Sequence, residues 1–199
     1  AADNIAKSTI NLAVTKAVTT VTAASITALA TDVTVATALN TLTAASAANS
    51  DNIINLTSTA ASTLTHNGTG DNLTINASGN LTVTDANNEE ALVIVGAGTV
   101  TITDLTPVAV TANSTNITAA TGITITDSTS AGNLDLTATT GNITITTGAN
   151  HQNQTGGSNL TMTALAGNIV TNAAGVDLMA GVVTATATGN VTDVSTTND

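Results

Sequence analysis

Hydrophobic and polar residues alternate strictly in a short phrase that recurs along the chain: Asn, Gly or Thr, then an aliphatic residue, Thr, an aliphatic residue and, in most copies, Thr. Copies occupy 72–75, 80–84, 99–103, 122–126, 142–146 and 159–163. A period of two residues is that of a β-strand, so we expect the aliphatic members to point inward and the threonines outward. The pattern predicts an all-β protein.

Glycines divide the alternating segments from residue 67 onward into units of similar length. Gly122, Gly132 and Gly141 are nine or ten residues apart, and the interval from Gly79 to Gly98 is nineteen residues. One strand with its turn needs about ten residues. This spacing suits a parallel β-solenoid with coils of roughly twenty residues, or alternatively an antiparallel β-sandwich or jelly roll. The doubled interval favours the solenoid.

The two parts of the chain differ in composition. Residues 1–62 are rich in Ala, Thr and Val and lack glycine, and we expect this N-terminal segment to be mostly strand and to serve in assembly. Residues 63–199 form a Thr-rich β-repeat domain punctuated by Gly and Asn. Within that domain, Glu89 and Glu90 predict a loop. The apolar run at 92–95 predicts a strand buried on both faces.

Composition limits both the core and the partners. Hydrophobic residues make up 42% of the 199 residues, yet no aromatic residue is present, so the core must be thin. Charged residues are only 8% of the chain, the net charge is −11, and the cations are Lys7 and Lys16 alone. Such a chain repels phosphate, which argues against nucleic acid and anionic membranes as partners.

Several features favour a secreted or cell-surface location. The absence of cysteine excludes disulfides and thiolate metal sites but does not by itself fix the compartment, and the chain contains neither a bilayer-spanning apolar run nor a basic leader with an apolar segment. It begins Ala1-Ala2-Asp3, as a mature protein does after a leader is removed. Scarce basic and aromatic residues also remove most cleavage points for common proteases. We therefore expect an extracellular protein attached to a cell surface or matrix.

The phrase Gly-Asn-aliphatic-Thr/Asp-aliphatic-Thr, found at 79–84, 132–137 and 141–146, resembles the repeats of filamentous-haemagglutinin-type adhesins and related bacterial surface proteins. The resemblance covers mainly residues 70–192, and residues 1–62 do not share it. It implies a right-handed parallel β-helix that acts in adhesion or surface coating.

Aspartates follow several predicted strands, and they are the candidate metal ligands of the chain. The simpler interpretation is that these aspartates close turns, because an Asp side chain can hydrogen-bond to the backbone two residues further along the chain. If coils stack, the carboxylates converge with Asn side chains and carbonyls into oxygen cages for calcium. The glycine-rich calcium nonapeptide is missing. The candidates are Asp85, Asp104, Asp127 and Asp193, and calcium is the one cofactor that the sequence suggests.

Catalytic chemistry has little support in the sequence. His66 and His151 are the only histidines, and both lie in polar Asn- and Gly-rich contexts that indicate solvated turns. Glu89 and Glu90 are adjacent, so on a strand they face opposite sides and cannot form a facing carboxylate pair. We therefore expect no enzyme and no catalytic residue.

Assembly and surface roles remain. The segment containing Ile10, Leu12 and Val14 is a candidate donor strand for a neighbouring subunit, or an ordinary first strand of its own domain. Rows of Thr-x-Thr resemble the flat arrays of ice-binding solenoids, although Thr is also a common outward residue on strands. These rows are Thr82/Thr84, Thr101/Thr103, Thr124/Thr126, Thr144/Thr146 and Thr161/Thr163. The leading hypothesis is a structural protein that polymerises with itself into a filament, surface layer or adhesive stalk. The alternative is a ligand-binding β-solenoid for ice or a calcium-dependent adhesin.

Overall fold

The computed structural model describes residues 9–12, 21–22, 33–37, 41–45, 51–106, 114–129, 133–150, 159–171, 178–179 and 182–193. All regular structure in these residues is β-strand, which confirms the all-β prediction. The strands are β1 (Thr9–Leu12), β2 (Val21–Thr22), β3 (Val33–Thr37), β4 (Thr41–Ala45), β5 (Asp51–Leu56), β6 (Ser62–Ala77), β7 (Leu81–Gly96), β8 (Val100–Thr106), β9 (Ser114–Ala119), β10 (Ile123–Thr129), β11 (Asn133–Ala138), β12 (Ile143–Asn150), β13 (Asn159–Ala164), β14 (Ile169–Thr171), β15 (Leu178–Met179), β16 (Val182–Ala187) and β17 (Val191–Asp193).

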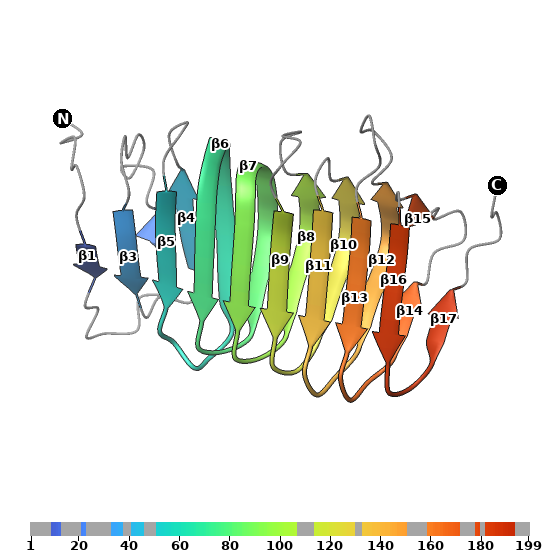
Figure 1. Cartoon of the computed structure of the whole chain (residues 1–199). Coiled ribbons are helices and arrows are strands. Elements are labelled where there is room, and N and C mark those ends of the chain that lie inside the picture. Colours follow the sequence, from blue (N-terminus) through green and yellow to red (C-terminus); the bar gives the residue numbers. More distant parts are fainter. Residues whose placement is uncertain are drawn as a thin grey trace.

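The strands form a parallel β-solenoid with two facing sheets (Figure 1). The front sheet contains β1, β3, β5, the second halves of β6 and β7, β9, β11, β13 and β16. The back sheet contains β2, β4, the first halves of β6 and β7, β8, β10, β12, β14, β15 and β17. Every strand pairing among the described residues is parallel, so the antiparallel alternative is wrong.

The coil is right-handed. In Figure 1 the front strands run downward, the fainter back strands run upward, and the chain advances from left to right. This is the hand that parallel crossover connections almost always adopt, because strand twist favours it. Because strands of successive coils pair with each other, the backbone hydrogen bonds between coils run along the axis of the rod.

Coil length varies, yet the register between coils is kept. Stacked residues are 19 apart at Asn80 and Thr99, 26 apart at Asn142 and Asn168, and 22 apart at Asn168 and Asn190. From β5 onward, the lower connections in Figure 1 span only three to five residues. The longer insertions fall at the upper edge, where residues 107–113 and 151–158 separate successive strands.

The core is a set of stacked aliphatic columns between the two sheets. Alternate residues of each strand point inward, and β11 and β13 both show the same alternation of exposed or half-buried and buried positions. On the back sheet, Ile102, Ile125 and Ile145 pair in succession and each is 0% exposed. Small branched side chains fill this narrow space at high density. The inward and outward assignment made from the alternating phrase is therefore confirmed for these strands.

Two details differ from the sequence expectations. The run at 92–95 alternates, with Leu92 and Ile94 buried but Val95 46% exposed, so the prediction of burial on both faces was wrong. Glu89 and Glu90 lie within β7, not in a loop, because their backbone continues the strand across the upper edge. β4 and β5, which precede residue 62, both pair with β6, and the division of the chain at residue 62 stays a prediction.

Glycines occupy one column of the lower turns because the stacked backbones approach closely there. A Cβ at Gly141 would overlap the carbonyl oxygen of Thr121 in the preceding coil, and a Cβ at Gly167 would overlap that of Gly141. The requirement is steric, since a side chain has no room between two turns that bond to each other. In the preceding coil, the turn position equivalent to Gly141 is occupied by Thr121 instead of a glycine.

Asparagines next to these glycines form a ladder along the lower edge. The Asn142 side-chain Oδ1 accepts hydrogen bonds from the Asn168 backbone N at 2.8 Å and from its Nδ2 at 3.3 Å. The Asn168 Oδ1 in turn accepts from the Asn190 backbone N at 2.8 Å. The Asn80 Oδ1 likewise accepts a hydrogen bond from the Thr99 backbone N at 2.9 Å. Backbone donors that a turn would leave unpaired are satisfied in this way.

We predict that Ile125→Ala lowers the free energy of unfolding by about 3 kcal/mol, because it leaves a cavity between two buried isoleucines. Thr124→Ala, on the outward face of the same strand, should change it by less than about 0.5 kcal/mol. Chemical denaturation followed by circular dichroism measures both. If the two variants lowered the free energy of unfolding equally, the assignment of Ile125 to the inward face and Thr124 to the outward face would be contradicted.

Gly141→Ala should destabilise the protein by at least about 2 kcal/mol, because the new methyl group meets backbone that cannot move without breaking the ladder. Thr121→Ala is the matched control, since that turn position already carries a Cβ, and its effect should be small. Thermal unfolding of both variants tests this. A Gly141→Ala protein as stable as the control would show that the turns are not held at contact distance.

Candidate functional surface

Two columns of threonines run along the outward side of the back sheet. Register places one Thr per coil in the first column, and the Thr two residues further along each strand falls in the second. Among the described side chains, the first column contains Thr63, Thr82, Thr101, Thr124 and Thr144, and the second contains Thr65, Thr84, Thr103, Thr126 and Thr146. The backbone register places Thr41 beside Thr63 and Thr43 beside Thr65.

The geometry of this Thr surface follows from the strands that carry it. Neighbouring coils are about 4.8 Å apart and alternate residues of a strand about 6.6 Å apart. The outward threonines from Thr63 to Thr146 are half-buried, except Thr103, which is exposed. The result is a repeating array of hydroxyl and methyl groups without formal charge, regular in the first column and interrupted by bulges in the second.

Hydroxyl groups of the second column bond along the axis. The Thr65 and Thr84 Oγ1 atoms are 2.6 Å apart, where Thr84 forms a bulge relative to β6. The Thr146 Oγ1 donates to the Ile125 and Thr126 carbonyl oxygens at 3.3 and 3.4 Å. These bonds restrict the rotamers of the second column and keep its hydroxyl groups in order.

The sequence phrase placed one threonine pair on the wrong surface. Thr161 and Thr163 belong to β13 in the front sheet, where Thr161 pairs with Asp135 and Thr184. Conversely, the phrase missed Thr41/Thr43 and Thr63/Thr65, which join the back-sheet columns. The signal for them was present, because each pair flanks a single leucine, but no glycine precedes it.

The outward side of the front sheet is mixed rather than uniform. It carries Ile53 and Val95, which are 38% and 46% exposed, and the Asn76 Nδ2 donates to the Asn55 Oδ1 at 2.9 Å. Asp135 is half-buried on the same side. This surface lacks the single chemistry of the Thr surface.

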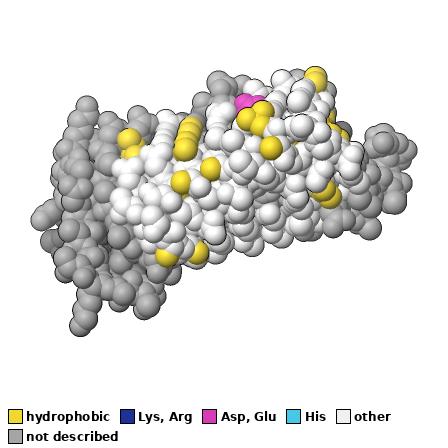
Figure 2. Space-filling model, turned by 90° about the horizontal axis from the view of Figure 1, so that it is seen from below, with side chains coloured by type: hydrophobic (Ala, Val, Ile, Leu, Met, Phe, Trp, Pro, Cys, Tyr) yellow, Lys and Arg dark blue, Asp and Glu magenta, His cyan; other side chains and the backbone are white. Residues whose placement is uncertain are grey.

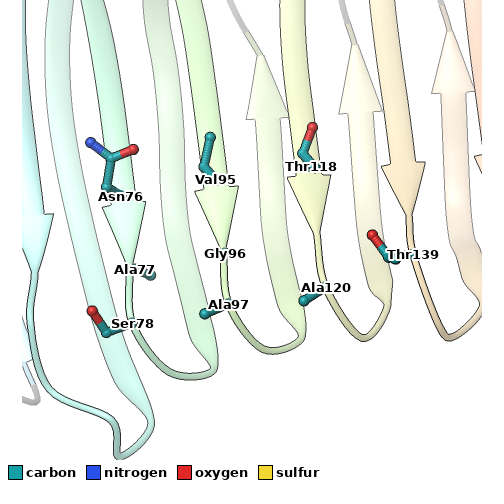
Figure 3. Close-up of a pocket in the computed structure, with 9 residues that line it drawn as sticks. All are labelled: Asn76, Ala77, Ser78, Val95, Gly96, Ala97, Thr118, Ala120 and Thr139. Atoms are coloured by element: carbon teal, nitrogen blue, oxygen red, sulfur yellow. The ribbon is translucent and has the colours of Figure 1, made fainter.

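A shallow hollow of about 400 Å³ lies at the lower end of the front sheet. Figure 3 shows Asn76, Val95 and Thr118 in a row on successive strands above it, with Gly96 below Val95. Gly96 contributes only backbone to the lining, because a Cβ there would overlap the Val100 Cγ2 atom in the core. Its lining contains no ionisable residue, so it offers small apolar and hydroxyl contacts only.

The backbone register relates the four calcium candidates to one another. Asp104 and Asp127 pair directly in β8 and β10. Asp85 lies between Val83 and Ala86, which pair with Ile102 and Leu105. Asp193 pairs with Thr171 in another column. The side chains of all four lie outside the described ones, so calcium binding stays a prediction. Among the described residues, no three His, Asp or Glu side chains gather around a common point.

The proposed donor segment is partly described. Ile10 and Leu12 lie in β1, which pairs in parallel with β3 of the same chain, whereas Val14 lies outside the described residues. β1 is therefore a strand of its own solenoid, and donation to a second subunit stays a prediction.

Of the two histidines, His66 lies in β6, and His151 lies outside the described residues.

The surface seen from below carries little charge (Figure 2). Its described part consists mostly of uncharged polar side chains and backbone, with scattered hydrophobic side chains and one small acidic group. None of the described segments is a helix that could cross a lipid bilayer.

The two-sheet parallel coil is compatible with the β-helix repeat proteins that the sequence phrase resembles. A finer family assignment needs a match in sequence or structure. Comparisons of the chain with protein-family models, with curated proteins and with solved structures gave no match.

Proposed function

We propose that this chain is a secreted or cell-surface structural protein that builds a filament, surface layer or adhesive stalk by association with itself. Its work is mechanical and interfacial, and it needs no catalytic residue. A β-solenoid is compatible with such a role because each coil hydrogen-bonds to the next and the rod grows by stacking. The proposed kinship with filamentous-haemagglutinin-type adhesins agrees with this role.

One observation carries the proposal: the front sheet keeps a single register from β1 to β16. The column of paired positions that begins at Ile10 continues through Ile54, Ile94 and Leu136 to Ala185 without a slip, and Ile54, Ile94 and Leu136 are buried. A stack of this regularity is rigid along its length, and its sides present hydroxyl and amide groups instead of a charged cleft. These are properties of a spacer or coat.

We predict that the purified chain forms filaments or ordered layers at micromolar concentration, visible by negative-stain electron microscopy. Stacked backbone groups and a surface with few charges favour association along strand edges. Sedimentation velocity over a dilution series gives the matching solution measurement. A chain that stays monomeric in both experiments would contradict the structural proposal.

The Thr surface supports a second candidate function, the ordering of water or binding of ice. The observation that favours it is the in-register repeat of the first column, in which Thr63, Thr82, Thr101, Thr124 and Thr144 pair in succession and present one hydroxyl group per coil to water. A structural coat protein would not need repeated outward threonines confined to the back sheet. Methyl groups between the hydroxyl groups limit competing hydrogen bonds with bulk water.

For this second function we predict a measurable thermal hysteresis in a dilute solution of the protein. Thr124→Lys should abolish it, because a charged side chain interrupts the lattice at its centre. Thr137→Lys makes the same change on the front sheet and should leave the freezing gap unchanged. No gap in the unaltered protein, or equal effects of the two variants, would rule out a role of the Thr surface in ice binding.

A further inference from the structure

The hollow of about 400 Å³ at the lower end of the front sheet is a groove that runs along the axis of the rod. Two rows of side chains form its walls, and both rows cross successive strands in register. Figure 3 shows these rows on either side of Gly96. The first row contains Asn76, Val95 and Thr118, and the second contains Ser78, Ala97, Ala120 and Thr139.

The floor of the groove is backbone. Ala77 and Gly96 lie between the two rows, and both are buried. Their carbonyl oxygens accept hydrogen bonds from the Ala97 and Ala120 backbone N atoms at 2.8 and 2.9 Å. Because these polar groups are already paired, a ligand that covers the floor leaves no backbone group unsatisfied.

The dimensions and polarity of the groove define the ligand that fits it. The groove crosses the lower ends of β6, β7, β9 and β11, a length of about 14 Å, and its two rows are about 6.6 Å apart. The polar side chains lie toward its two ends: Asn76 and Ser78 at one, and Thr118 and Thr139 at the other. The apolar side chains between them are Val95, Ala97 and Ala120.

We propose that this groove binds an elongated, planar aromatic cation, with the long axis of the ligand parallel to the rod. The ring system covers Val95 and Ala97, and polar groups at its ends meet Asn76 and Thr118. A rigid ring system suits a shallow groove because, unlike a flexible chain, it loses little conformational freedom on binding. The volume of the groove falls within the range of roughly 300–1,000 Å³ that is typical of small-ligand sites.

Charge selects a cation over an anion. The chain carries a net charge of −11, and none of the described residues that line the groove is ionisable. Asp135 is half-buried on the same side of the front sheet, in the neighbouring outward column and one strand beyond Thr118. This carboxylate and the anionic chain attract a cationic ligand and repel an anionic one such as a fatty acid.

The test uses thioflavin T, an elongated planar aromatic cation, and equilibrium dialysis against the full chain measures its dissociation constant. We expect Ala97→Gln to weaken binding at least about tenfold, because the longer side chain fills the centre of the groove. Ala166→Gln is the matched control, since it makes the same change at an exposed alanine of the lower turn between β13 and β14. The control should change the dissociation constant by less than about twofold. Circular dichroism checks that both variants fold as the parent does.

Two further measurements test the selection by charge. Asp135→Asn should weaken thioflavin T binding about two- to threefold, because it removes one partly screened carboxylate near the groove. Anilinonaphthalene sulfonate, an aromatic anion, should bind at least about tenfold more weakly than thioflavin T. Equal affinities for the two dyes, or an Asp135→Asn variant that binds thioflavin T as the parent does, would overturn the preference for a cation.

The comparison of the alanine variants decides whether the groove is the site. Tight binding by Ala166→Gln and weak binding by Ala97→Gln would support it, because only the second change enters the groove. Equal binding by the two variants would place the dye elsewhere on the rod and overturn the inference. A parent chain that binds no thioflavin T would overturn it as well.

Discussion

The parallel register between coils is the constraint on which the rest of this structure depends. Each coil must present its backbone groups about 4.8 Å from those of the next, whatever its length. Once that register is held, residues at equivalent positions stack, so inward aliphatics form columns and outward polar residues form rows. The Gly141–Gly167 turn contact and the Asn142–Asn168 ladder both serve this spacing at the lower edge.

The same constraint explains the unusual composition. Two sheets that face each other closely leave no room for rings, and columns of Ile, Leu and Val fill the space between them. The aliphatic columns are interrupted by three small polar residues, each less than 5% exposed: Ser62, Thr115 and Thr171. A core of this kind has little tolerance for larger side chains, and the order of the Thr surface follows from the regularity of the columns beneath it.

Much of the fold could be predicted from the two-residue period and the glycine intervals, because both are local. The alternation at 142–146 assigned faces correctly, and the nineteen-residue interval between Gly79 and Gly98 matched one coil. The period could not say which sheet a strand joins. Gly-Asn precedes β12 in the back sheet and also β11 in the front sheet. For that reason Thr161 and Thr163 were grouped with the wrong rows, and an apolar residue on the exposed side, Val95, was taken for core.

The uneven edges of the rod have a consequence for how such a chain can change. Short lower turns locked by glycine and asparagine set the pitch, whereas the back-sheet register changes toward the opposite edge: Ile145 pairs with Thr171, and Ala149 pairs with Leu178. The front sheet resumes its own register at β9 and β13, after the intervals 107–113 and 151–158. A protein built in this way can acquire new loops along one flank, each at a fixed axial height, while the flank beneath remains an unvarying spine.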